Sequence, residues 1–335
     1  MKAKMSKWCE GERIRLADVV PLDTPISLLI EPSSVCNFRC FYCFHGNMQE
    51  EIKKLGHMNK VMEYSIFEKL IKDALIFPRQ VKAINLSRFG EPLINKKITE
   101  MVYLAKSSGA CNMVKIITNG SLLTPQLNKN LISSGLDVLR ISIQGISEKQ
   151  IFDTCGYKIN FYEFVRNIED FYKNRGNCKV FIKILDNIVS NETEKFYQIF
   201  GNICDEISIE HLIENKNYVA IKDKGKKELI NMMGEKCDNV DVCSSPFYSL
   251  NIAADGSISP CCNDIEGKII FGNVVENSLV DVWNSKKLNL FRVMHLQEKR
   301  YHHQVCGRCC APTYTNQRYD NIDSVKKSLL KHYNT

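Results

Sequence analysis

The sequence lacks any apolar run long enough to cross a membrane, because nowhere do about 18 consecutive residues stay apolar. Its first residues, Met1 to Arg15, are charged and contain no apolar core of a signal peptide. Lysine and arginine exceed the acidic residues to give a net charge of +7, but they form no block of like charge and do not alternate with aromatic residues. We therefore expect a cytoplasmic protein that binds neither membrane nor nucleic acid.

Low-complexity segments and internal repeats are also absent, and 44% hydrophobic and 25% charged residues are typical of a globular protein. The 335 residues are enough for one large domain of roughly 200–250 residues and a smaller one. Cysteine, by contrast, is abundant, with 15 residues. Without a signal peptide these cysteines indicate a reducing compartment, where clustered cysteines are more often metal ligands than disulfides.

Three cysteines, Cys36, Cys40 and Cys43, occupy one short loop with the spacing C-x3-C-x2-C. Thiolates favour iron–sulfur clusters, zinc or Cu(I). A [4Fe–4S] cluster normally takes four cysteines, one for each iron, so three cysteines leave one iron open. Zinc sites usually show paired C-x2-C knuckles that close to four ligands, and no fourth cysteine follows at short range. His45 is nearby, but a histidine in a loop is more often solvated.

This loop, with the aromatic Tyr42 directly before its third cysteine, resembles the cluster loop of the radical SAM superfamily. The resemblance implies a [4Fe–4S] cluster on Cys36, Cys40 and Cys43 whose open iron binds the amino and carboxylate groups of S-adenosylmethionine (SAM). It makes these cysteines the catalytic centre: the reduced cluster delivers one electron to SAM, and the 5′-deoxyadenosyl radical abstracts a substrate hydrogen. An electron donor such as flavodoxin or ferredoxin is the implied partner.

Apolar strands alternate with amphipathic helices six times, which predicts an α/β fold with a parallel sheet and right-handed crossovers. The strands read as near-continuous apolar runs, as expected when both faces of a sheet are enclosed. The pattern fits a doubly wound open sheet equally well, whereas the resemblance implies a partial (β/α)6 barrel. The predicted strands are Ile26–Glu31, Val81–Leu86, Met113–Thr118, Asp137–Ile143, Lys179–Leu185 and Glu206–Leu212.

A glycine–glutamate pair, Gly90-Glu91 before Pro92, follows the second predicted strand. Active sites of parallel α/β folds lie at the carboxyl ends of the strands. The pair resembles the family's GE motif, which receives the SAM amino group, and an ammonium group needs such acceptors. The alternative is a surface turn, which glycine and proline also favour.

Further polar residues stand at or within the later strands. Asn119 follows the third strand, and Ser142 and Gln144 end the fourth. The resemblance assigns Ser142 to SAM, whereas many family members carry an acid where Gln144 stands, so Gln144 is open to substrate. Lys183 and His211 interrupt apolar strands and are candidates if they point into a barrel, but they have the alternative of facing outward. The candidate cofactor-binding residues are Tyr42, Gly90, Glu91, Pro92, Asn119, Ser142, Gln144, Lys183 and His211.

The cysteines return near the carboxyl end, around a hairpin signal at Asp255-Gly256. This arrangement resembles the SPASM/twitch extension of radical SAM enzymes, which holds auxiliary [4Fe–4S] clusters. The complete SPASM pattern needs more cysteines than follow here, so the resemblance implies one auxiliary cluster. Its ligands would be Cys243, Cys261, Cys306 and Cys309, with Cys262 or Cys310 able to replace a neighbour. A four-thiolate zinc site is the alternative.

The resulting domain organisation has four parts. We expect an N-terminal extension over 1–25, the barrel over 26–221, an auxiliary cluster domain over 236–315 and a tail over 316–335. A lysine-rich connection, Lys222 to Lys227, would be a solvated loop.

A fully ligated auxiliary cluster can accept an electron from a substrate radical, which favours an oxidative reaction. We therefore expect a radical SAM oxidoreductase that dehydrogenates a small polar metabolite such as a sugar, aminosugar or nucleotide sugar. Epimerisation remains open if a thiol such as Cys155, expected in a loop, donates hydrogen. Maturation of a ribosomally made peptide is the alternative substrate class. A non-catalytic iron–sulfur or zinc protein is the alternative of another kind.

Overall fold

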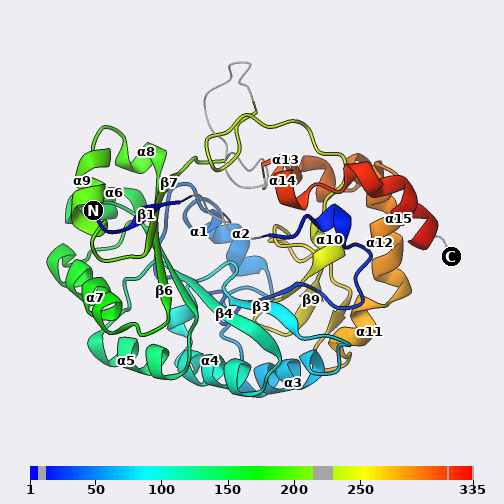
Figure 1. Cartoon of the computed structure of the whole chain (residues 1–335), viewed down its shortest axis with the longest axis horizontal. Coiled ribbons are helices and arrows are strands. Elements are labelled where there is room, and N and C mark those ends of the chain that lie inside the picture. Colours follow the sequence, from blue (N-terminus) through cyan, green and yellow to red (C-terminus); the bar gives the residue numbers. More distant parts are fainter. Residues whose placement is uncertain (7–12, 214–228, 315–316, 334–335) are drawn as a thin grey trace.

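The computed structural model describes residues 1–6, 13–213, 229–314 and 317–333. In these residues one curved sheet runs through the molecule, with the strand order β1-β7-β6-β5-β4-β3-β2-β8-β9-β10 (Figure 1). The strands are β1 (Lys4–Met5), β2 (Ser27–Ile30), β3 (Val81–Leu86), β4 (Cys111–Thr118), β5 (Val138–Ile143), β6 (Lys179–Leu185), β7 (Glu206–Glu210), β8 (Ser249–Ile252), β9 (Ser257–Ser259) and β10 (Gly272–Asn273).

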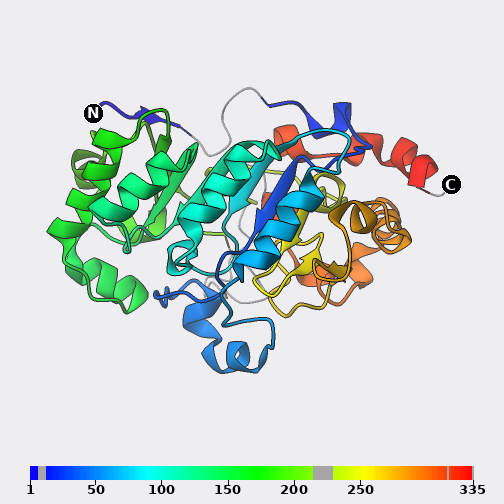
Figure 2. The same cartoon turned by 90° about the horizontal axis from the view of Figure 1, so that it is seen from below.

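Helices cover the convex face of this sheet, and β1 and α15 lie at opposite ends of the molecule (Figures 1 and 2). The helices of the barrel region are α1 (Phe44–Asn47), α2 (Gln49–Lys54), α3 (Tyr64–Ala74), α4 (Ile98–Ser107), α5 (Pro125–Ser133), α6 (Glu148–Cys155), α7 (Phe161–Asn174), α8 (Asp186–Val189) and α9 (Thr193–Phe200). Those of the carboxyl-terminal region are α10 (Ser245–Tyr248), α11 (Leu279–Trp283), α12 (Lys286–Leu296), α13 (Ala311–Tyr314), α14 (Gln317–Asp320) and α15 (Lys326–Tyr333).

The six predicted parallel strands are β2 to β7, each paired in parallel with the next. The prediction of an α/β partial barrel is therefore confirmed. Two predicted strands have the observed bounds, and the others differ by one or two residues at an end. Local chemistry explains the helix starts: the hydroxyl of Thr124 accepts the N–H of Leu127 at 3.2 Å, with Pro125 in the first turn.

The two faces of the sheet differ in polarity. Leu28, Ile84 and Ile141 are fully buried and face the helices, as the apolar pattern predicts. Their sequence neighbours point to the concave face, where Lys183 pairs in register with Ser142 on one side and Ser208 on the other. The concave face therefore carries polar side chains, because alternate residues of a strand point to opposite faces.

The carboxyl-terminal region continues the barrel sheet. Strand β8 pairs in parallel with β2 over the whole of Ser27–Ile30, and β9 returns antiparallel to β8. The predicted hairpin at Asp255-Gly256 is confirmed, with Gly256 at a φ of 85° that favours glycine. The indole N–H of Trp283 also donates to the carbonyl of Leu22 at 3.1 Å. The second cysteine group is thus attached to the first through paired backbone.

In the described residues, no helix is both long and apolar enough to span a bilayer. The predicted connection Lys222–Lys227 and the predicted barrel end at 221 lie outside the described residues, as does Cys9. The proposed division into domains stays a prediction.

Candidate active site

The three-cysteine loop leaves β2 and ends where α1 begins, with Cys43 at the helix N-cap. Its turn is tight: a Cβ on Gly46 would lie 2.3 Å from the carbonyl oxygen of Cys40, so only glycine fits there. The loop is fastened to the end of α6, since the N–H of Arg39 donates to the carbonyl of Cys155 at 2.8 Å. Beyond the loop, the blue segment that carries α1 and α2 projects from one side of the sheet (Figure 2).

The thiols of this loop are suited to a metal cluster. Burial raises the pKa of Cys36 to about 12 and also raises the pKa of Cys43. A hydrogen bond with the thiol of Cys155, together with burial, raises the pKa of Cys40. The thiols therefore hold their protons until a cationic metal replaces them, which is how metal binding is coupled to proton release. Three soft donors in one loop fit a cluster with one open iron.

Cys155 was expected in a loop, and the structure shows that this expectation is wrong. It is the last residue of α6, and the helix ends there because Gly156 takes the left-handed conformation, with a φ of 66°. The thiol donates to the carbonyl of Ile151 at 3.0 Å and is 1% exposed.

The carboxylate of Glu91 joins the ends of β3 and β4. It accepts the hydroxyl of Thr118 at 2.6 Å and the backbone N–H groups of Leu93 at 3.0 Å and Asn119 at 2.8 Å. Burial raises the pKa of this carboxyl group to about 7. Gly90 lies against the segment before Cys36, where a Cβ would meet backbone oxygens at 2.2 and 2.5 Å. The predicted glycine–glutamate pair thus lies beside the cluster loop, with its carboxylate already bound by three donors.

A chain of amides holds the cluster loop from the same side. The side-chain amide of Asn119 donates to Asn37 Oδ1 at 2.9 Å, and Asn37 donates to the hydroxyl of Ser121 at 2.8 Å. Asn37 stands inside the cysteine motif, and its role was missed by the sequence prediction. An amide directly after Cys36 was the only signal available.

Two more predicted residues, Tyr42 of the cluster loop and Gln144 after β5, form a hydrogen bond. The hydroxyl of Tyr42 donates to Gln144 Oε1 at 2.5 Å, and Gln144 donates to the backbone carbonyl of Ser142 at 3.1 Å. Gln144, at the end of β5, therefore orients the aromatic residue that stands between two cluster cysteines.

A buried ionic group lies on the concave face. Lys183 Nζ is 3.0 Å from Glu210 Oε2, and Arg140 binds the other carboxylate oxygen of Glu210. Burial lowers the pKa of Lys183, although Glu210 opposes the shift. Although burial disfavours the carboxylate, Lys183 and Arg140 together hold the pKa of Glu210 below its usual value. Lys183 is within electrostatic range of Cys40, so this group faces the cluster loop.

His211 behaves differently from Lys183. It lies just beyond β7, its side chain is 40% exposed, and its Nδ1 is 2.5 Å from Asp186 Oδ2. The structure brings Lys183, but not His211, into the ionic group of the concave face.

The carboxyl-terminal cysteines gather around a cavity of about 60 Å³. The four predicted ligands, Cys243, Cys261, Cys306 and Cys309, line it, and Cys262 lines it as well. Cys310 is not among the lining residues. In the described part of the chain, no three Cys, His, Asp or Glu side chains converge on the position of a single ion. Five thiols around one cavity match the donor set of an iron–sulfur cluster, whose ligands are distributed over several irons.

Buried basic side chains support this cavity. Arg300 is 3% exposed and donates to the carbonyls of Val240 at 2.9 Å, Asp241 at 2.8 Å and Cys309 at 3.3 Å. His295 Nε2 is 3.8 Å from Cys306 Sγ. Burial lowers the pKa of His295 to about 3, so the ring is neutral at physiological pH.

Comparison with known families agrees with this arrangement. Residues 30–199 match the radical SAM superfamily, and residues 243–310 match SPASM, an iron–sulfur cluster-binding domain. The chain is 24% identical over 321 residues to the tungsten-containing aldehyde ferredoxin oxidoreductase cofactor-modifying protein of Pyrococcus furiosus, covering 84% of this chain and 86% of that protein. It is 23% identical over 295 residues to the S-adenosyl-L-methionine-dependent 2-deoxy-scyllo-inosamine dehydrogenase of Niallia circulans, covering 88% and 96%.

Solved structures share the fold. The crystal structure of BtrN in complex with AdoMet and 2-DOIA superposes with a TM-score of 0.56 at 17% identity, covering 91% of this chain and 99% of that one. Streptococcus suis SuiB bound to precursor peptide SuiA superposes with a TM-score of 0.61 at 19% identity, covering 81% and 67%. The same architecture thus accommodates both a small molecule and a peptide.

Proposed function

The chain belongs to the radical SAM superfamily and carries a SPASM domain, and from this premise we propose that it oxidises a small polar metabolite by removing hydrogen. The enzyme takes a [4Fe–4S] cluster, SAM and auxiliary iron–sulfur. When bound, these groups supply a 5′-deoxyadenosyl radical and an acceptor for the electron that the substrate gives up. The chain's own residues bind and orient the reactants.

On this proposal Cys36, Cys40 and Cys43 hold the open cluster, and Cys243, Cys261, Cys306 and Cys309 hold one auxiliary cluster. Gly90 presses the strand end against the loop, and Glu91 and Asn119 fix that arrangement through their hydrogen bonds. Tyr42 and Gln144 close the loop on the barrel side. SAM would lie between these elements, with Ser142 and Pro92 at its margin.

The observation that favours a small polar substrate is the ionic group of Lys183, Glu210 and Arg140 on the concave face. The carboxylate accepts hydrogen bonds and the ammonium group donates them, so the two together can bind the hydroxyl or amino groups of one compact molecule. Ser208, register partner of Lys183, is 8% exposed, and its hydroxyl has no hydrogen-bond partner among the described residues. Together these side chains are suited to a hydroxylated or aminated ring.

Similarity to the 2-deoxy-scyllo-inosamine dehydrogenase, whose name specifies an aminated substrate, supports the same class. Peptide maturation is the second candidate, because SuiB bound to a precursor peptide shares the fold.

A direct assay distinguishes the two classes. The reconstituted, reduced enzyme is supplied with SAM and either a panel of sugars, aminosugars and aminocyclitols or a set of cysteine-containing peptides. We expect a member of the first panel to be converted to a product two mass units lighter, with one 5′-deoxyadenosine formed per product. Conversion of peptides alone would contradict the proposal.

A further inference from the structure

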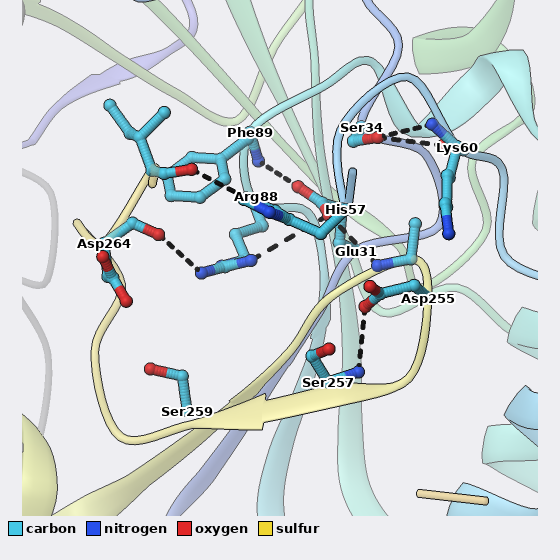
Figure 3. A network of polar contacts seen from close by, with 12 residues as sticks. Glu31, Ser34, His57, Lys60, Arg88, Phe89, Asp255, Ser257, Ser259 and Asp264 are labelled. Atoms are coloured by element: carbon cyan, nitrogen blue, oxygen red, sulfur yellow. Dashed lines mark hydrogen bonds and ion pairs between the residues drawn. The ribbon is translucent and has the colours of Figure 1, made fainter. Parts of the chain in front are cut away.

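A buried ion pair lies between the two cysteine groups and belongs to neither. Glu31 stands directly after β2 and Arg88 just after β3, and their side chains are 0% and 4% exposed. Arg88 Nη1 is 3.9 Å from Glu31 Oε2. Figure 3 shows Arg88 between Glu31 and the segment of Asp264, with the ring of Phe89 beside it.

On one side the pair reaches the open-cluster loop. The guanidinium of Arg88 lies over the ring of Phe89, 4.1 Å from its centroid. That ring meets the ring of Phe44 edge to face at 5.3 Å, and Phe44 directly follows Cys43. The carbonyl of Phe89 is 3.0 Å from His45 Nε2. The aromatic contacts therefore form a packed connection from the cluster loop to the guanidinium.

On the other side the pair reaches the auxiliary site. Arg88 Nη2 is 3.5 Å from the carbonyl oxygen of Asp264, two residues after Cys262. The same carboxylate oxygen of Glu31, Oε2, also accepts the N–H of Ala254 at 3.1 Å, in the hairpin that leads to Cys261. A guanidinium carries a permanent charge, so this cation acts on the auxiliary site at every physiological pH.

We propose that Arg88 raises the reduction potential of the auxiliary cluster so that it accepts the substrate's electron, and that Glu31 limits this effect. Reduction makes a thiolate-bound cluster more negative by one charge, and a nearby cation stabilises that state more than the oxidised one. Net charge, hydrogen bonds to sulfur and burial are the quantities that set such potentials. In a buried site the interaction is weakly screened. On this proposal Arg88 acts on the auxiliary site through its charge, from its contacts with Glu31, Phe89 and Asp264.

Arg300 is a second buried cation, and it lines the cavity of the cysteines. It donates to three backbone carbonyls that shape the cysteine loops, so its replacement would disturb the fold and could not report on charge alone. Asp264 directs its carboxylate to the N–H of Ile269 at 2.5 Å. His57 is 2.7 Å from the carbonyl of Ile265 and contributes to the field at Glu31. Arg88 enters this region from the end of β3, in the barrel.

This inference rests on the auxiliary cluster of the proposed function, but it does not depend on which substrate the enzyme oxidises. Its test is a redox titration followed by electron paramagnetic resonance of the reconstituted full chain. The auxiliary signal is the one that persists when Cys36, Cys40 and Cys43 are replaced by alanine. R88Q should lower the auxiliary potential, and R88K should restore most of it. The expected change is about tenfold in the reduction equilibrium, or about 59 mV for a one-electron couple.

E31Q gives the opposite expectation, because it removes the compensating anion while Arg88 stays in place, and the auxiliary potential should rise. Arg79, whose side chain is 75% exposed, provides the matched control, and R79Q should leave the potential unchanged. If Arg88 and Glu31 only supported the fold, R88Q and E31Q would shift the auxiliary potential in the same direction or would not shift it. Either result would overturn the proposal. E31Q retains the guanidinium of Arg88, so its potential shift tests the proposal even if R88Q incorporates the auxiliary cluster poorly.

Discussion

Gly90 packs so closely against Val35 that a Cβ at position 90 would lie 2.5 Å from the Val35 carbonyl oxygen. The N–H of the next residue, Glu91, donates to that same oxygen at 2.9 Å. The end of β3 is thereby held against the chain that enters the cluster loop one residue before Cys36. Cys36 thus keeps its position because residue 90 is a glycine and has no side chain.

Replacing Gly90 by alanine should therefore destabilise the chain and reduce loading of the open cluster. The added carbon meets backbone atoms that cannot move aside, so the loss of unfolding free energy should be about 3 kcal/mol. Urea denaturation and iron analysis measure the two effects. Gly56, which has no heavy atom within 4 Å of its ideal Cβ, is the control, and G56A should match the parent in both. Equal stability of G90A and G56A would show that the contact does not matter.

Cysteine replacements should divide the iron content between two sites. The parent should bind about eight irons per chain when reconstituted without oxygen. Alanine at Cys243 or Cys309 should leave about four irons and preserve SAM cleavage at the open cluster. Alanine at Cys40 should also leave about four but abolish cleavage.

The same analysis identifies the ligand after β9. Cys261 and Cys262 both line the cavity, and we expect C261A to lose four irons and C262A to retain all eight. The reverse result would assign Cys262 as the ligand. One or two zinc ions in place of iron in the parent would contradict both cluster assignments.

The buried carboxyl group of Glu91 should make stability depend on pH. Its pKa is raised from 4.5 to about 7 in the folded chain, so folding favours the protonated form. The stabilisation from this group is complete below pH 4.5 and is lost as pH rises toward 7, because ionisation then costs burial of a charge. The expected loss is about 3 kcal/mol over that interval.

E91Q cannot ionise and should lack this component. Urea denaturation of cluster-free parent and E91Q, at pH values between 5 and 8, measures the difference between their stabilities. The parent should lose stability relative to E91Q as the pH rises. A constant difference across the range would show that Glu91 titrates alike in the folded and unfolded chains.

Replacing Lys183 by methionine should separate SAM cleavage from substrate turnover. The variant removes the ammonium group that faces the cluster loop but keeps a side chain of similar length. We expect slow cleavage of SAM without substrate to persist, whereas kcat/KM for the metabolite falls about 10 to 100-fold, as for loss of a charged hydrogen bond. K179Q, at an exposed position of the same strand, should behave as the parent. Equal losses in both reactions would assign Lys183 to SAM instead of substrate.

Much of the fold was predictable because its signals are local. The spacing of Cys36, Cys40 and Cys43 defines the open cluster in eight consecutive residues. Val81–Leu86 and Lys179–Leu185 were located correctly because apolar runs bounded by polar turns are typical of strands in parallel sheets.

The remaining features depend on strand order and register, which periodicity does not contain. Nothing in the sequence indicates that β8 would pair with β2, and this pairing brings the two cysteine groups into one sheet. The Glu31–Arg88 pair exists because the ends of β2 and β3 are neighbours. Lys183 could be identified from the sequence because it interrupts an apolar strand, but its register pairing with Ser208 on the neighbouring strand was not predictable.

On the proposed function, the open cluster generates a radical that takes hydrogen from a small polar metabolite. The most direct measurement supplies the reduced enzyme with SAM and a substrate deuterated at its ring carbons, and follows deuterium by mass spectrometry. We expect one deuterium in 5′-deoxyadenosine for each oxidised product, with neither compound formed when Cys36, Cys40 and Cys43 are replaced by alanine. Product formation with unlabelled 5′-deoxyadenosine, or without SAM cleavage, would contradict it.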